Sequence, residues 1–269
     1  MSNLAEIVAA TRRKVSECRS KVNMRDLERQ AGSHIPRGFR AALMSASESG
    51  VAVIAELKKA SPSRGLIRRD FDPAKLAREL AGAGAAALSV LTDEEFFQGS
   101  LENLRIASAE TNIPCLRKDF IVDEFQIVEA RANSADAILL IVAALSQNEL
   151  ITLKQKADDQ EVDVLCEVHD ENELQLALGA GCDLIGVNSR DLRTFKVDLG
   201  TTYRLAERMP ENVLAVAESG IESGADIAQL RSAGYGAFLI GETLMKAQKP
   251  GEALKSLRIE ASTASAIAR

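Results

Sequence analysis

Residues 51–58 read VAVIAELK, a short apolar run that ends in a glutamate and a lysine. Seven more apolar runs follow it, and successive runs begin 21 to 35 residues apart. Each interval can hold a strand, a helix and two short loops, so each run predicts a βα unit. Eight such units predict an α/β fold, the closed parallel (β/α)8 or TIM barrel. The predicted strands are 51–57, 86–91, 113–118, 136–141, 162–167, 183–187, 213–218 and 236–240.

The length of the chain suits one such barrel with additions at its two ends. The chain has 269 residues, of which 46% are hydrophobic, enough for a substantial core. We expect a helical N-terminal extension over 1–48, packed on one end of the barrel, and the barrel itself over 49–260. The Ala- and Ser-rich stretch 261–269 is expected to be a frayed tail.

The charge balance and the cysteines exclude several classes of function. Lys and Arg (33) are outnumbered by Asp and Glu (39), giving a net charge of -6, the opposite of a nucleic-acid-binding protein. No apolar run is long enough for a membrane span or a signal peptide, so we expect no membrane partner and a cytoplasmic location. Four scattered cysteines and two histidines do not form the spacing of a metal site, so no metal is predicted.

Polar side chains end several of the predicted strands, where the active site of a parallel barrel gathers. Because side chains alternate along a strand, Glu56 and Lys58 share one face. If all the strand-end groups point into the mouth, two amines and three carboxylates meet there, and their pKa values are coupled. Purely structural salt bridges, above all between Glu56 and Lys58, are the alternative. The candidate residues are Glu56, Lys58, Lys118, Glu167, Asn188 and Glu218.

Glycines after the last two predicted strands point to a phosphate site. Gly220 and Gly241 lie where barrels bind phosphate through backbone N–H groups, although they could simply form tight turns. Glu242 would repel a phosphate, so we expect its side chain to turn outward. The loop 61–65, SPSRG, follows Lys58 and could add a hydroxyl and a guanidinium, or be an exposed turn.

Seven segments together resemble the indole-3-glycerol-phosphate synthase family of tryptophan biosynthesis. The resemblance runs from about residue 4 to about residue 257, in the family's order and spacing. The family is a (β/α)8 barrel with an N-terminal helical extension. The segments are AELKKASPSRG (55–65), FFQGS (96–100), LRKDFIVDEFQI (116–127), CEVHDENEL (166–174), IGVNSRDLRTF (185–195), AESGI (217–221) and FLIGETLM (238–245).

The resemblance implies a carboxy-lyase that uses no cofactor. Such an enzyme cyclises 1-(o-carboxyphenylamino)-1-deoxyribulose 5-phosphate, a small anionic sugar phosphate, to indole-3-glycerol phosphate and releases carbon dioxide and water. The matching positions imply Lys118 as general acid, Glu167 as acid/base, and Lys58 in substrate orientation and dehydration. The remaining strand-end residues, Glu56, Asn188 and Glu218, look like groups that hold the lysines and the substrate hydroxyls.

The resemblance also implies binding residues. Arg190 resembles the residue near the anthranilate carboxylate, and residues 36–39 resemble a segment that folds over the mouth. The aryl slot would be lined by Phe97, Phe120 and Leu192, each of which could instead be plain core packing. Phosphate-handling positions are Ser61, Ser219, Gly220 and Gly241.

Two other functions stay open at this stage. Lys118 in a desolvated mouth could be the nucleophile of a Schiff-base aldolase acting on a sugar phosphate. The same barrel could also be a non-catalytic binding protein for a phosphate sugar, although three carboxylates would weaken the binding of an anion. Because Lys118 ends a strand, we expect Lys118→Ala to abolish turnover with little change in the thermal midpoint.

Overall fold

Eight parallel strands close into a barrel in the computed structural model, which describes residues 4–190 and 198–267. The strand order around the barrel is β1-β10-β9-β8-β7-β6-β5-β4, so each strand pairs with its neighbours in the chain. The predicted (β/α)8 barrel is therefore confirmed. The strands are β1 (Ala52–Leu57), β4 (Ala87–Leu91), β5 (Cys115–Lys118), β6 (Ala137–Ile141), β7 (Asp163–Val168), β8 (Leu184–Asn188), β9 (Leu214–Glu218) and β10 (Ala237–Ile240).

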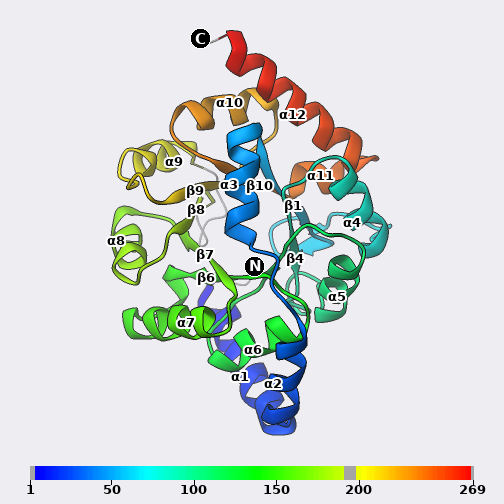
Figure 1. Ribbon diagram of the computed structural model, residues 1–269, viewed down its shortest axis with the longest axis vertical. Helices are drawn as coiled ribbons and strands as arrows, with labels where there is room; N and C mark the ends of the chain where they lie inside the picture. The colour runs from blue at the N-terminus through cyan, green and yellow to red at the C-terminus, as the bar shows by residue number, and fades with distance from the viewer. Residues whose placement is uncertain (1–3, 191–197, 268–269) are drawn as a thin grey trace.

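Helices surround the barrel, and polar caps fix where several of them begin (Figure 1). Asp72 accepts a hydrogen bond from the Lys75 N–H, and Ser146 and Ser223 form capping boxes with residues three positions further on. These caps satisfy N–H groups that lack a partner within the helix. The helices are α4 (Pro73–Gly82), α5 (Leu101–Ala109), α6 (Glu124–Ala132), α7 (Gln147–Asp159), α8 (Glu171–Gly179), α9 (Leu199–Ala206), α10 (Gly224–Ser232), α11 (Glu242–Lys246) and α12 (Pro250–Ile267), with a 3-10 turn η1 (Val142–Ala144).

Alternation along the strands divides the core into an outer and an inner part. Outward residues pack against the helices, whereas Ile54, Leu116, Leu165 and Val216 form the inner core. The same alternation, continued two residues further along each strand, places polar side chains on the inner face at the carboxyl end. These side chains are Glu56, Lys118, Glu167 and Glu218.

The last helix of the extension, α3 (Phe39–Ser49), closes the amino-terminal end of the barrel. Phe39 and Leu43 are completely buried in the inner core, and Figure 1 shows α3 in front of the strands. Just before α3, Arg37 binds Asp136, the residue that precedes β6. The prediction that residues 36–39 fold over the mouth is therefore wrong. The buried side chains of α3 and the ion pair between Arg37 and Asp136 hold this segment at the opposite, amino-terminal end of the barrel.

The other two helices of the extension lie along the side of the barrel, and α1 reaches the mouth. They are α1 (Leu4–Lys21) and α2 (Met24–Ser33), and α2 packs against α6. Helix α1 forms an ion pair of 2.8 Å between Lys14 and Glu94, which lies beyond the carboxyl end of β4. The extension thus contacts both ends of the barrel.

Two segments differ from the expectations drawn from the sequence. The loop after β1 folds into a small hairpin of β2 (Ala60–Ser61) and β3 (Gly65–Leu66), where a plain loop was expected. Helix α12 continues to Ile267 although a frayed tail was expected from residue 261, and Ala261 is fully buried. None of the described helices is both apolar and long enough to cross a lipid bilayer.

Candidate active site

A cavity of about 620 Å³ opens at the carboxyl ends of the barrel strands. It collects all the predicted site residues except Leu192, which lies outside the described residues. Side chains more than 150 residues apart in the sequence therefore line one space. Those brought together are Glu56, Lys58, Ser61, Phe97, Lys118, Phe120, Glu167, Asn188, Arg190, Glu218, Ser219, Gly220 and Gly241.

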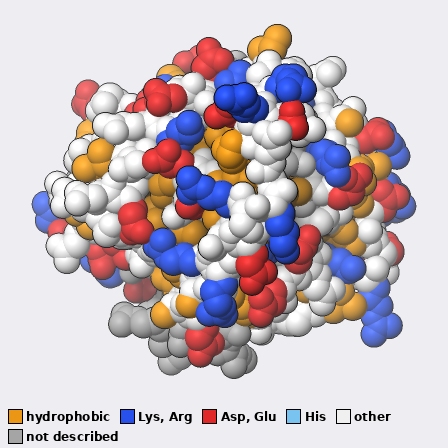
Figure 2. Space-filling view, turned by 90° about the horizontal axis from the view of Figure 1, so that it is seen from below, with side chains coloured by type: hydrophobic (Ala, Val, Ile, Leu, Met, Phe, Trp, Pro, Cys, Tyr) orange, Lys and Arg blue, Asp and Glu red, His pale blue; other side chains and the backbone are white. Residues whose placement is uncertain are grey.

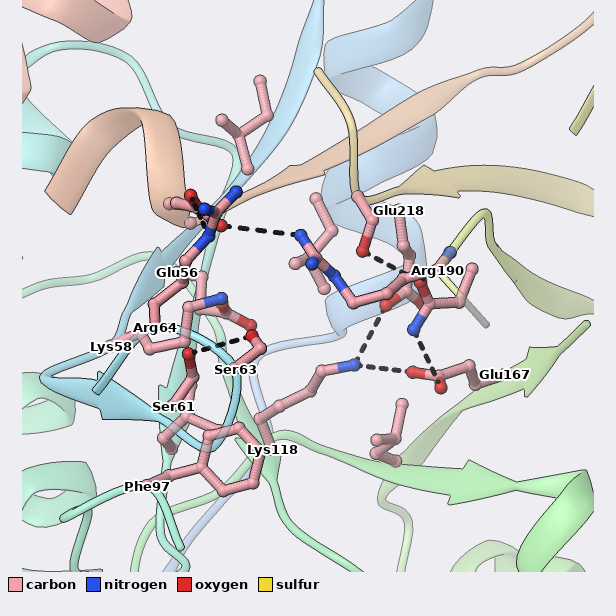
Figure 3. Close-up of a pocket in the computed structure, with 18 of the residues that line it drawn as sticks. Glu56, Lys58, Ser61, Ser63, Arg64, Phe97, Lys118, Glu167, Arg190 and Glu218 are labelled. Carbon is pink, nitrogen blue, oxygen red and sulfur yellow. Dashed lines mark hydrogen bonds and ion pairs between the residues drawn. The ribbon is translucent and has the colours of Figure 1, made fainter. Parts of the chain in front are cut away.

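Lys118 lies at the centre of the charged groups (Figure 3). Its Nζ donates to Glu167 Oε2 at 2.8 Å and to Glu218 Oε2 at 2.9 Å. Burial by itself would lower the pKa of Lys118, but the attraction of Glu167 and Glu218 outweighs it and raises the pKa above its usual value. Lys118 is therefore an ammonium group at neutral pH and a proton donor to anything bound beside it.

The two carboxylates on Lys118 differ in their surroundings and in their pKa. Burial raises the pKa of Glu218 to about 7, with repulsion from Glu167 opposing the attraction of Lys118. For Glu167, burial also acts upward, but Lys118 and His169 together hold its pKa well below the usual range. One carboxylate thus stays ionised while the other can exchange a proton near neutral pH.

Two glycines on inward-facing positions make room for these carboxylates. A Cβ atom at Gly186 on β8 would collide with Glu218, and one at Gly241 would collide with Glu56. The role of Gly241 thus includes space for a buried side chain, in addition to the close backbone approach expected from the sequence.

The second lysine forms a separate pair at the end of β1, which β4 separates from β5. Lys58 Nζ lies 2.5 Å from Glu56 Oε1, with Glu56 buried and Lys58 partly exposed to the cavity. The pair was expected from the alternation of β1. It leaves the Lys58 ammonium on the cavity wall while its carboxylate partner lies beneath it.

Asn188 organises the loop after β8 and links it to Glu167. Its amide donates to Glu167 Oε1 at 3.1 Å, and its Oδ1 accepts from Ser219 Oγ at 2.8 Å and from the Arg190 N–H at 3.0 Å. Ser219 and Gly220 both adopt positive φ, 66° and 71°, so the chain turns sharply after β9. This turn lines the cavity with small residues, as a phosphate site requires.

The expected outward orientation of Glu242 is wrong. Its carboxylate lies in the cavity wall, 3.0 Å from Arg64 Nε, 3.5 Å from the Arg190 guanidinium and 2.5 Å from Lys246 Nζ. Three cations neutralise the carboxylate, which removes the repulsion on which the expectation rested. The loop residue Arg64 therefore contributes to the cavity rather than to an exposed turn.

The aromatic side of the cavity is formed by Phe97 and Phe120. Their ring centroids lie 6.2 Å apart, and both rings are partly exposed in the cavity rather than lost in the core. Asp93 fixes the first ring by accepting hydrogen bonds from the N–H groups of Phe96 and Phe97. An apolar slot next to Lys118 can hold an aryl ring.

Several site residues were missed in the sequence. Asp93, Asp119 and Lys246 line the cavity, and His169 lies directly behind Glu167. Lys246 follows Glu242 by four residues, a spacing that indicates an ion pair on a helix. His169 follows Glu167 by two, so strand alternation would have placed both on one face.

Sequence comparison decides the family to which this site belongs. Residues 4–257 match the indole-3-glycerol phosphate synthase family. A protein of that name from Koribacter versatilis is 58% identical over 256 residues, covering 95% of this chain and 98% of the relative. One from Acidithiobacillus ferrooxidans is 47% identical, covering 94% and 97%. The chain belongs to the indole-3-glycerol phosphate synthase family.

Solved structures outside the indole-3-glycerol phosphate synthase family share the barrel. A mandelate oxidase variant matches with a TM-score of 0.64 at 18% identity, covering 90% of this chain and 94% of its own. Thiamine phosphate pyrophosphorylase from Pyrococcus furiosus matches with a TM-score of 0.61 at 16% identity, covering 80% and 96%. These similarities concern the fold alone, whereas the family match extends over residues 4–257 of the sequence.

Proposed function

We propose that this cavity carries out the reaction of the family. It would convert 1-(o-carboxyphenylamino)-1-deoxyribulose 5-phosphate to indole-3-glycerol phosphate, carbon dioxide and water. The observation that carries the proposal is the position of the Lys118 ammonium, held between Glu167 and Glu218 in a cavity with an aromatic wall. That arrangement provides a proton donor, a base and an aryl slot in one space.

In the ring-closing step, Lys118 acts as the general acid. The aryl carbon attacks the substrate ketone, and negative charge develops on the ketone oxygen. The Lys118 ammonium donates its proton to that oxygen, a contribution of about 10²–10⁴-fold in rate for a well-placed general acid. The bond between the attacking aryl carbon and its carboxylate then breaks, carbon dioxide leaves, and the electron pair of that bond restores the aromatic ring.

In the dehydration step, the new hydroxyl leaves as water and a neighbouring proton is removed. Glu167 is the acid/base group, and the Lys58 ammonium, paired with Glu56, assists the departure of the hydroxyl. Asn188 holds Glu167 in place and Glu218 holds Lys118, through the hydrogen bonds described above. Which lysine acts in each step stays a proposal that separate substitutions can test.

The cavity offers partners for both anionic ends of the substrate. Arg190 lies where it can meet the anthranilate carboxylate, and the backbone of Ser219, Gly220 and Gly241 with the hydroxyl of Ser61 can meet the phosphate. On the face shown in Figure 2, basic and acidic side chains are interspersed, so that face is not an extended basic surface for a nucleic acid. The partner is a small anionic sugar phosphate, and the cytoplasmic location stays a prediction.

The charge state of Lys118 argues against the aldolase alternative. A Schiff-base lysine attacks as a neutral amine, and enzymes provide one by lowering the pKa of the lysine. Two buried carboxylates do the opposite for Lys118, whose pKa is raised. A purely binding role is disfavoured because binding an anion does not require the buried carboxyl groups of Glu56, Glu167 and Glu218, whereas proton transfer does.

The test is a fluorescence assay for the indole product formed from the carboxyphenylamino ribulose phosphate. The wild-type chain should form product, and Glu167→Gln should lose turnover while it retains substrate binding measured by calorimetry. Near-wild-type turnover of Glu167→Gln would remove this residue from the mechanism. Borohydride should trap no adduct at Lys118, and a trapped adduct would favour the aldolase.

A further inference from the structure

A histidine that does not line the cavity lies directly behind Glu167. His169 follows the end of β7, and its Nε2 lies 3.3 Å from Glu167 Oε1. Its other ring nitrogen, Nδ1, lies 3.0 Å from Glu173 Oε2, and its backbone N–H donates to the same oxygen at 2.8 Å. The three side chains form a continuous chain from the first turn of α8 to the cavity.

The outer member of this chain is itself held in place. Asp170 caps α8 and accepts a hydrogen bond from the Glu173 N–H at 2.9 Å. The cap therefore fixes the turn that carries Glu173, and Glu173 fixes the imidazole on two sides. The His169 side chain is 15% exposed, and that of Glu167 is 3% exposed, so the contact between them is poorly screened by water.

A comparison of the two carboxylates on Lys118 indicates what the histidine does. Glu167 and Glu218 receive the Lys118 ammonium at nearly equal distances, 2.8 and 2.9 Å. Their second oxygens differ. Glu167 Oε1 accepts a hydrogen bond from Asn188 and lies within ion-pair distance of His169 Nε2, 3.3 Å, although that contact lacks hydrogen-bond geometry. Glu218 Oε1 is buried with no hydrogen-bond partner among the described residues. Only Glu167 therefore keeps a charged partner when Lys118 loses its proton.

We propose that His169 is a positioning residue, which orients the Glu167 carboxylate and keeps it ionised while Lys118 transfers its proton to the substrate. In that step one N–H bond of Lys118 breaks, the proton goes to the substrate oxygen, and a neutral amine remains between two carboxylates. The imidazolium ion on the far side of Glu167 then supplies the positive charge that the lysine no longer carries. Glu167 stays available as a base for the later steps.

The charges around His169 and Glu167 favour this role. Burial by itself would lower the pKa of His169, but the attraction of the Glu167 and Glu173 carboxylates outweighs it and raises the pKa to about 10. The groups facing Glu167 from other strands are Lys118 on β5 and Glu218 on β9, one cation and one carboxylate. Without the imidazolium, the site would hold a neutral lysine and two buried carboxylates.

The test compares His169→Asn with Glu173→Gln. Asparagine carries no charge and is too short to reach Glu167 from the position of Nε2, so it removes the contact with Glu167. Glu173→Gln weakens the link to α8 and leaves the imidazole against Glu167. For His169→Asn we expect kcat about 10-fold lower with KM within about twofold. The acid limb of its kcat–pH profile, set by the coupled carboxyl groups of Glu167 and Glu218, should move upward by about one unit, because loss of a facing cation raises the pKa values of the pair.

The control and the refuting results separate this role from simple stabilisation. Glu173→Gln should lower the thermal midpoint about as much as His169→Asn, with its acid limb within about 0.3 units of wild type. An unmoved acid limb in His169→Asn, or equal shifts in both variants, would overturn the inference. The inference rests on the proposed function. If Glu167→Gln keeps its turnover, the proposed function itself fails. If Glu167→Gln loses its turnover but the acid limb of His169→Asn does not move, only the role of His169 is rejected.

Imidazole NMR offers a readout that does not depend on activity. The chain has two histidines, so His34→Asn assigns the His169 signals. The His169 ring should stay protonated through pH 8.5 in the wild type, and its pKa should fall by about one unit or more in Glu167→Gln. A His169 ring that titrates near its usual value in the wild type would contradict the proposal.

Discussion

Replacement of Lys118 by methionine should abolish turnover and also make stability depend on pH in a specific way. The substitution removes a buried ammonium that lies 2.8 Å from Glu167 and 2.9 Å from Glu218. Loss of one partner of a buried ion pair costs about 3–5 kcal/mol, because the remaining charge is not compensated. The sequence alone suggested a nearly unchanged thermal midpoint, and the buried pairing reverses that expectation.

The pH dependence comes from Glu218. Its folded-state pKa of about 7 lies above the value of 4.5 for an exposed glutamate, so its protonated form favours the native state. A raised carboxyl pKa gives stability that is present at low pH and is lost as the pH rises through the folded pKa. In wild type this loss ends near pH 7, whereas in Lys118→Met the pKa of Glu218 rises further and the loss continues.

The size of the effect follows from linkage. One proton held by the native state and not by the unfolded state changes stability by about 1.4 kcal/mol per pH unit. Between pH 7 and 8.5, the gap in unfolding free energy between wild type and Lys118→Met should therefore widen by about 2 kcal/mol. Between about pH 5 and 6, Glu218 is largely protonated in both proteins and should add no widening. At lower pH the gap should shrink, because the stabilisation of ionised Glu167 by Lys118 is lost when Glu167 is protonated.

Urea unfolding at several pH values, monitored by circular dichroism, measures this gap directly. The double variant Lys118→Met/Glu218→Gln is the control. Because it lacks the Glu218 carboxyl group, the difference between its unfolding free energy and that of wild type should not widen between about pH 7 and 8.5. A gap for Lys118→Met that is the same at pH 6 and pH 8.5 would refute the reasoning. Turnover of Lys118→Met within tenfold of wild type would refute the role of Lys118 as general acid.

Three further predictions concern other parts of the barrel. Gly186→Ala places a Cβ against Glu218 and should lower kcat by about 10²-fold, whereas Gly179→Ala, with open space around it, should leave kcat unchanged in the same assay. Phe39→Ala should cost about 3–5 kcal/mol in urea unfolding with kcat and KM unchanged, because Phe39 fills the end of the barrel opposite the cavity. Asp136→Asn should cost about 3 kcal/mol at pH 7. The difference in unfolding free energy between wild type and Asp136→Asn should shrink as the pH falls below 3.8. The native Asp136 has a lowered pKa, and its stabilisation is lost when it is protonated.

The barrel and its strand-end charges were predictable because both follow from a short-range pattern. Apolar runs at regular spacing indicate βα units, and alternation within each run decides which side chains face inward. The phase that buries Ile54 in the inner core also turns Glu56 inward, two residues later. Glu56 and Lys118 could therefore be assigned to one mouth from local sequence and the geometry of the fold.

The missed features depend on contacts between distant segments. The inward position of Glu242 requires Arg64 from the hairpin and Arg190 from the loop after β8, and neither partner is visible from the local sequence. The position of the turn before α3 depends on Asp136, which lies 99 residues from Arg37. Such pairings decide which end of a barrel a segment covers, and no periodic pattern encodes them.

The two ends of the barrel divide stability and chemistry between them. At the amino-terminal end, Phe39 fills the inner core and Asp136 accepts hydrogen bonds from Arg37 and from the backbone of Cys115. At the carboxyl end, Glu218 has a buried oxygen with no hydrogen-bond partner among the described residues, an arrangement that costs free energy. Apolar packing stabilises the amino-terminal end of the barrel. The carboxyl end can therefore keep a lysine and carboxylates in a partly desolvated cavity without loss of the fold. Substitutions at the amino-terminal end should therefore change the free energy of unfolding with little effect on kcat. Substitutions around Lys118 should change kcat, and also the pH dependence of kcat and of the free energy of unfolding.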